Sequence, residues 1–98
     1  MNKYTIFYSP QFQKGRARAI KSGLDVSKLD EAVEILASGE NPPARLSDHP
    51  LKGKWVGCRE CHIGGPKSDW VLIYQKFAEK VLLYLIRTGT HRELNIGG

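Results

Sequence analysis

Three histidines and one aspartate in the second half of the chain are the residues best suited to chemistry. His49, His62 and His91 each stand beside basic residues at an expected loop or strand end, and Asp69 lies between the last two. Imidazole takes up and releases protons near neutral pH, so several histidines with a carboxylate are typical of acid–base catalysis. The four residues therefore predict a site for proton transfer.

Cleavage of RNA without a metal ion is a reaction that such a site could perform. It needs a base to take the 2′-hydroxyl proton, an acid to protonate the leaving 5′-oxygen, and cations for the charge that grows on the phosphate. Arg87 offers a planar guanidinium that pairs with phosphate. Trp70 could stack on an unpaired base, although filling the core is the more ordinary role of a lone tryptophan.

A second motif, Cys58-Arg59-Glu60-Cys61-His62, suggests a different function, because C-x-x-C-H is the attachment motif of c-type haem. Haem of this type is attached after export, whereas no export signal is recognised and the only methionine is Met1. The motif also falls one ligand short of a structural zinc site. In an extended strand the three residues from Cys58 to Cys61 would span about 10 Å, against the roughly 5.5 Å between Cα atoms that a disulfide requires. We expect two free cysteines on opposite strand faces, with no haem, metal or other cofactor.

Length and charge limit the class of protein. The chain has 98 residues, 41% of them hydrophobic, which predicts a single domain over residues 1–98 whose small core would gain stability from a partner. Its longest apolar runs, 70–74 and 81–86, are too short to span a membrane, so a cytoplasmic protein is expected. The net charge of +5 favours a polyanionic partner.

Hydrophobic spacing and turn residues predict an α+β domain in the order β-α-α-β-β-β. A strand is expected over 3–8, a helix from Pro10 to a stop at Gly23, and a second helix capped by Ser27 and ended by Gly39. A proline-rich loop follows over 39–50, then strands over 55–63, 70–75 and 81–87. The strands should form an antiparallel sheet with both helices packed on one side. The first helix carries four basic candidates for RNA binding: Lys14, Arg16, Arg18 and Lys21.

Four ordered motifs, DHPLKGKW, RECH, SDWVLIY and RTGTHREL, resemble the YafQ branch of RelE-type toxins over residues 45–94. The resemblance implies a microbial-ribonuclease-like fold and the toxin role in a type II toxin–antitoxin system. It implies an endoribonuclease, an mRNA interferase that cleaves mRNA in the A site of the 30S ribosomal subunit without metal or cofactor. The implied partners are a cognate antitoxin protein and ribosome-bound mRNA.

The same resemblance implies roles for individual residues. His91 would be the general acid, while His62, Asp69 and His49 would share the base and orienting duties. The remaining matches would bind RNA, and they are Trp70, Arg87, Lys52 and Lys54.

The chain departs from the family at two places. Five residues, 64–68, lengthen the link between RECH and SDW, and Asn95 replaces an aromatic residue that could stack on a base. Strand alternation also places Arg59 and His62 on opposite faces, so either a bulge intervenes or only His62 faces the site.

Two other functions fit the same fold. A ParE-like toxin would inhibit DNA gyrase by protein contact, and an RNA-binding module would use the basic helix without catalysis. Three histidines and Asp69 favour the nuclease, because neither alternative needs a proton-transfer set.

Overall fold

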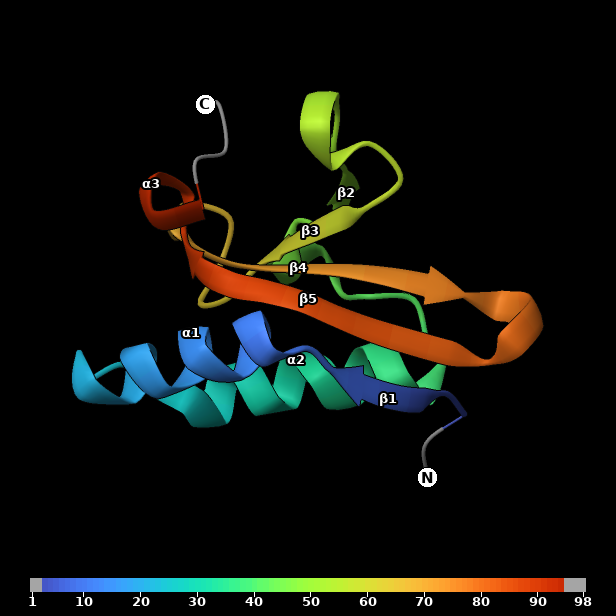
Figure 1. Cartoon of the computed structure of the whole chain (residues 1–98), viewed down its shortest axis with the longest axis horizontal. Helices are drawn as coiled ribbons and strands as arrows, with labels where there is room; N and C mark the ends of the chain where they lie inside the picture. Colours follow the sequence, from blue (N-terminus) through green and yellow to red (C-terminus); the bar gives the residue numbers. More distant parts are fainter. Residues whose placement is uncertain (1–2, 95–98) are drawn as a thin grey trace.

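A computed structural model describes residues 3–94, which form a five-stranded sheet with two helices packed against one face (Figure 1). The strands are β1 (Thr5–Tyr8), β2 (His49–Pro50), β3 (Arg59–His62), β4 (Trp70–Phe77) and β5 (Leu82–Thr90). The helices are α1 (Pro10–Lys21), α2 (Val26–Ser38) and the four-residue α3 (His91–Leu94). Three short 3-10 turns complete the elements: η1 (Ala44–Leu46), η2 (Gly53–Trp55) and η3 (Ala78–Lys80). None of the described helices has the length and apolar character needed to cross a membrane.

Helix α1 begins where the sequence predicts. The Ser9 hydroxyl accepts a hydrogen bond from the Phe12 backbone at 2.9 Å, and Pro10 occupies the first helical position. The same hydroxyl donates to the Ile86 carbonyl at 2.6 Å, which ties the helix start to β5. Phe12, Gly15 and Ala19 recur at helical spacing and form its buried stripe.

Helix α2 has the predicted end but not the predicted start. Asp25, rather than Ser27, is the N-cap, because its carboxylate accepts from the Ser27 backbone at 3.0 Å. Gly39 ends the helix in the left-handed conformation, with φ of 85°. The residues of α2 that face the core are Leu29, Ala32, Val33, Leu36 and Ala37.

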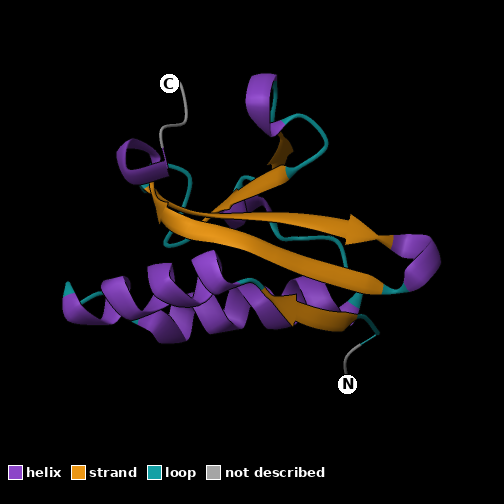
Figure 2. Cartoon of the chain, viewed as in Figure 1, coloured by secondary structure: helices purple, strands orange, loops and turns teal. Residues whose placement is uncertain are grey.

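The sheet has the order β1-β5-β4-β3-β2 (Figure 2). The antiparallel pairing of β3, β4 and β5 and the helices on one side are confirmed. Two details differ from the prediction. Strand β1 runs parallel to β5. The last two residues of the loop expected over 39–50 form the short strand β2. A further difference is that β3 starts only at Arg59, because η2 occupies part of the predicted strand.

A β-bulge in β5 decides which side chains share a face. Ile73 pairs with Arg87 but Tyr74 pairs with Leu85, which leaves Ile86 as the extra residue. Leu85 therefore faces the larger core beneath the helices, while Ile86 packs into a smaller cluster on the other face with Ile73. The bulge places Arg87 directly across from Ile73, beside that smaller cluster.

At Gly15 the backbone of α1 closely approaches the backbone of β5. A Cβ atom there would stand 2.2 Å from the Thr88 carbonyl oxygen, a contact with backbone that a rotamer change cannot relieve. We predict that Gly15→Ala lowers the free energy of unfolding by about 1–3 kcal/mol through overpacking. Denaturant unfolding checks this, with exposed Lys14→Ala in the same helix as the control. Equal stability of Gly15→Ala and parent would contradict the close packing.

Candidate active site

One buried carboxylate gathers the three histidines. Glu60 is 2% exposed, and its Oε2 lies 2.8 Å from His49 Nε2 and 3.4 Å from His62 Nε2. Its Oε1 lies 3.0 Å from His91 Nε2. The rings follow one another, with centroid separations of 5.7 Å from His49 to His62 and 5.4 Å from His62 to His91. Residues spread over 43 positions of sequence thus meet at a single carboxylate.

Sheet register explains how the cluster forms. His49 pairs with Glu60 across β2 and β3, and His62 follows Glu60 by two residues, which returns it to the same face. His91 is the first residue of α3, immediately after β5. Its backbone N–H donates to the Asp69 carbonyl at 3.1 Å, which joins the end of β5 to the start of β4.

The outer ring nitrogens also have partners. His91 Nδ1 lies 2.9 Å from Asp69 Oδ1, and His62 Nδ1 donates to the Ser68 carbonyl at 3.0 Å. Ionised carboxylates accept hydrogen bonds and do not donate them. Both nitrogens of His91 face carboxylates, so its surroundings complement the doubly protonated imidazolium, the form that a general acid must have.

A capping box holds the turn that carries His91. Thr90 Oγ1 accepts from the Glu93 backbone at 3.1 Å, while Glu93 Oε1 accepts from the Thr90 backbone at 2.8 Å. Arg18 of α1 reaches Glu93 Oε2 at 3.7 Å. The sequence T-H-R-E therefore fixes the backbone on both sides of His91.

The four predicted catalytic residues differ in how far they reach solvent. The exposed fraction of the side chain is 62% for Asp69, 46% for His49, 29% for His91 and 13% for His62. His49 and His91 can therefore contact a bound substrate from the two ends of the cluster. His62, between them, is mostly covered by its neighbours.

Arg87 lies in the same row of cross-strand neighbours as Glu60 and His49. The register runs from Arg87 to Ile73, from Ile73 to Glu60 and from Glu60 to His49. Within residues 3–94, Arg87 forms no side-chain ion pair, so its guanidinium is available to a phosphate. The predicted grouping of Arg87 with the histidines follows from this register.

Trp70 lies elsewhere. It is 8% exposed, belongs to the core beneath the helices, and its indole Nε1 donates to the Thr88 hydroxyl at 3.2 Å. The indole is therefore not presented as a stacking surface, because β4 alternation turns it away from the site face. Of the two roles considered for Trp70, filling the core is the one that the structure displays.

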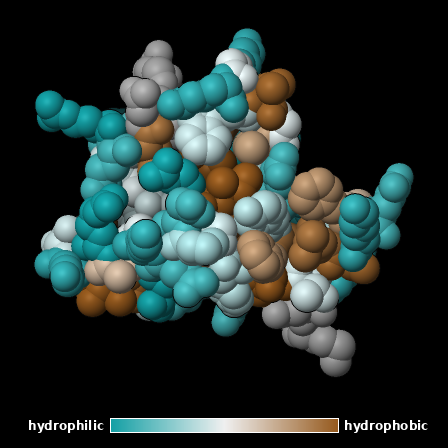
Figure 3. All heavy atoms as spheres, in the orientation of Figure 1, coloured by the Kyte–Doolittle hydropathy of each residue, from teal (hydrophilic) through white to brown (hydrophobic). Residues whose placement is uncertain are grey.

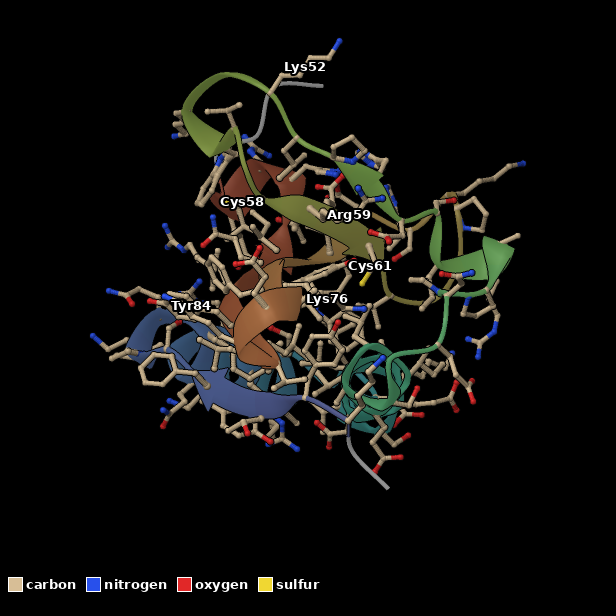
Figure 4. The ribbon with its side chains drawn as sticks, turned by 90° about the vertical axis from the view of Figure 1, so that its right-hand side faces the viewer. Lys52, Cys58, Arg59, Cys61, Lys76 and Tyr84 are labelled. Carbon is tan, nitrogen blue, oxygen red and sulfur yellow. The ribbon has the colours of Figure 1, made fainter. Side chains whose placement is uncertain are left out.

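The lysine and arginine candidates are spread over two sides of the molecule. Lys52 precedes η2 and Lys54 lies within it, and Lys52 extends from the body into solvent (Figure 4). Lys54 lies over the Trp55 ring at 5.8 Å. The basic residues of α1 lie in the helical layer on the other side of the sheet, where Arg16 is engaged by Asp30 at 2.7 Å.

Glu60 is the residue that sequence reasoning missed. A signal existed, because alternation along R-E-C-H places Glu60 and His62 on one face of β3. The same alternation settles the question left open for Arg59. The β3–β4 register runs without interruption from Arg59 to His62, so no bulge intervenes and only His62 faces the site.

Three side chains of the cluster could hold a metal ion. The ligand atoms of His49, Glu60 and His62 lie within 4.8 Å of one another, and they are the only group of this kind within residues 3–94. Two imidazoles and a carboxylate suit a divalent transition metal. The cysteines of C-x-x-C-H are not part of this group, which argues against the zinc site that their spacing suggested.

The cysteines occupy opposite faces of the sheet as predicted. Cys61 is fully buried in the core beneath the helices, and its sulfur lies below the β3 ribbon in Figure 4, whereas Cys58 packs with Val71 and Ile73 on the other face. Burial raises the pKa of the Cys58 thiol. Burial, with the nearby charges of Asp48 and Glu60, raises the pKa of Cys61 to about 12.

We predict that Cys61 resists alkylation in the folded protein. A pKa of about 12 leaves about one thiol in 10⁴ ionised at pH 8, and the thiolate is the reactive form. Iodoacetamide labelling followed by mass spectrometry should modify Cys61 only after unfolding in denaturant. Labelling of native and unfolded protein at the same rate would contradict this assignment.

Comparison with known proteins agrees with the geometry. Residues 4–96 match the model of the family described as bacterial toxin of type II toxin–antitoxin system, YafQ. The mRNA interferase toxin YafQ of Escherichia coli K12 is 41% identical over 90 residues, covering 91% of this chain and 92% of that protein. Among solved structures, YafQ in the E. coli DinJ–YafQ toxin–antitoxin complex has a TM-score of 0.83 at 38% identity, covering 97% of this chain and 99% of that one.

A metal-bound toxin from Helicobacter pylori also shares the fold, with a TM-score of 0.82 at 37% identity and coverage of 93% of this chain and 98% of that one. The family model and the E. coli toxin both span nearly the whole chain. The chain therefore belongs to the YafQ family of bacterial toxins of type II toxin–antitoxin systems.

Proposed function

We propose that this chain is the toxin of a type II module and an endoribonuclease that cleaves mRNA on the ribosome by metal-independent acid–base catalysis. The observation that carries the proposal is the cluster of three histidines on Glu60, in one sheet row with Arg87. The name of the E. coli relative, an mRNA interferase, supports the same substrate class.

The two exposed rings suit the two proton transfers. His49 takes the proton from a 2′-hydroxyl, the freed oxygen attacks phosphorus, and the bond from phosphorus to the 5′-oxygen breaks. One ring N–H of His91 turns from its carboxylate to that departing oxygen and gives it a proton, so the products are a 2′,3′-cyclic phosphate and a 5′-hydroxyl. An in-line displacement places base and acid on opposite sides of the phosphate, and these rings stand on opposite sides of His62.

Glu60 and Asp69 act through the histidines in this mechanism. Glu60 is too deeply buried to reach the substrate, but its carboxylate stabilises an imidazolium wherever the proton resides. Asp69 orients His91 through Nδ1, and the Ser68 carbonyl orients His62 in the same way. Arg87 binds the phosphate and stabilises the charge that develops on it.

The partners follow from family membership and surface character. The E. coli relative is seen bound to the DinJ antitoxin, and we propose a cognate antitoxin for this chain in the cytoplasm. Large apolar side chains remain exposed, and Figure 3 shows hydrophobic residues gathered on the centre and right of one face. Over the described chain as a whole, the exposed large apolar residues are Phe7, Tyr8, Ile20, Leu24, Val56, Phe77 and Val81. The basic candidates Lys14, Lys21, Lys52 and Lys54 would contact ribosomal RNA through its phosphates.

His91→Ala should abolish cleavage while the protein still folds. Loss of one positioned proton donor costs about 10²–10⁴-fold in rate, and a single partly exposed imidazole adds little affinity for a long RNA. The measurement is cleavage of mRNA on programmed ribosomes, with binding of the cognate antitoxin as the check on folding. Arg92→Ala, the next residue of α3, is the control and should keep the parental kcat. Parental cleavage by His91→Ala would refute the mechanism, and gyrase inhibition by a parent that never cleaves RNA would favour the ParE-like function.

Zinc should inhibit the enzyme rather than activate it. An ion held by His49, Glu60 and His62 would occupy the imidazole lone pairs that proton transfer requires. We expect cleavage to fall as ZnCl₂ approaches the protein concentration and to return on addition of EDTA, with calorimetry showing one site that His62→Ala weakens. Loss of activity in EDTA alone would instead make a metal ion part of the catalyst.

A further inference from the structure

Asp48 lies on the opposite side of the backbone from His49. His49 faces Glu60, and the extended chain turns the preceding side chain to the other face of the sheet. There Asp48 Oδ1 accepts a hydrogen bond from the Tyr74 hydroxyl at 2.7 Å. Arg59 Nε donates to both carboxylate oxygens of Asp48, at 3.2 and 3.3 Å. The catalytic site itself uses none of these three side chains.

The surroundings of Asp48 make this arrangement firm. The Asp48 side chain is 12% exposed and Tyr74 is 1% exposed, so water competes little for the hydrogen bond between them, whereas the Arg59 side chain is 43% exposed. Burial, and then the bond to Asp48, raises the pKa of Tyr74, which keeps the phenol protonated as a donor. Hydrogen bonds to an ionised carboxylate are stronger than neutral ones.

The segment that carries His49 has little regular secondary structure, although Leu46 is buried in the core and the Leu51 backbone donates to the Cys58 carbonyl at 2.9 Å. Strand β2 contains only two residues, and the segment before it is a 3-10 turn followed by Ser47 in the left-handed conformation. A two-residue strand makes few ladder bonds, and His49 is nearly half exposed. Within residues 3–94, Asp48 is the side chain of this segment that forms hydrogen bonds to both β3 and β4.

We propose that Asp48, Arg59 and Tyr74 form a positioning clamp that sets the place of His49 against Glu60 and thereby the rate of RNA cleavage. The inference rests on the proposed base role of His49. It assigns Arg59, the first residue of R-E-C-H, to the face of β3 opposite the site. The motif R-E-C-H then has two roles. Arg59 helps to hold the segment that carries His49, and His62 of the same strand belongs to the site itself.

Tyr74→Phe tests the clamp because it removes one hydroxyl and keeps the buried ring. We expect kcat to fall by about 10- to 100-fold, as for a base held slightly out of place, while KM stays near the parental value. The control is Tyr84→Phe on the adjacent strand β5, whose hydroxyl has no hydrogen-bond partner within residues 3–94, and which should leave kcat unchanged. Asp48→Asn is the second variant and should show the same split between kcat and KM.

A double-mutant cycle separates positioning from stability. If the clamp acts through His49, adding Tyr74→Phe to His49→Ala should cause no further loss of kcat. An equal fractional loss in the two backgrounds would overturn the proposal, as would parental kcat in both clamp variants.

The imidazole signals of His49 in a ¹⁵N–¹H NMR spectrum give a readout independent of activity. They should shift in Tyr74→Phe and stay in place in Tyr84→Phe. Shifted signals with a fully active His49→Ala would retain the clamp and reject the base role of His49. Unshifted signals in both clamp variants would reject the clamp itself.

Discussion

The structure of the site depends on the burial of one charge. The Glu60 side chain is buried on the site face of the sheet, where a carboxylate without hydrogen-bond partners would be strongly unfavourable. Its two oxygens are satisfied by rings from β2, β3 and α3. Each of these elements is short, and their mutual positions are linked because the same carboxylate binds all three histidines. The contacts that place the three histidines for chemistry are therefore the same contacts that hold β2, β3 and α3 together here.

Strand β3 serves two purposes on its two faces. Glu60 and His62 face the site, whereas Arg59 and Cys61 face the helices, with Cys61 inside the larger core. The strand is central in the half of the sheet that carries the site, paired with β2 on one side and β4 on the other. A shift of its register by one residue would exchange the two faces, burying the site's carboxylate and histidine in the core. The core residues of β3 thus help to fix the chemistry of its other face.

Sequence reasoning found the fold class, α1, the end of α2 and the three histidines, because these depend on local patterns of caps, turns and alternation. It missed Glu60, although alternation along R-E-C-H places Glu60 on the same face of β3 as His62. It also left two roles open for Trp70, base stacking and core packing. In the structure Trp70 is buried, because strand alternation places it on the face of β4 opposite the site. The row from Arg87 to Glu60 depends on a bulge at Ile86, a long-range feature of pairing that no short pattern reveals. The replacement at Asn95 lies outside the described residues.

The longer link between R-E-C-H and the following strand shows that the number of residues between two motifs is a weak guide to how close their side chains lie. Hydrogen bonds at the two ends of the link are a better guide. The Ser68 carbonyl returns to His62, while the Asp69 carbonyl and carboxylate both meet His91. The intervening residues close a turn, with the Ser68 backbone donating to the Gly65 carbonyl at 3.0 Å. The turn within the link lies away from the contacts of Asp69, whose position beside His91 is held by hydrogen bonds at the start of β4 and the end of β5.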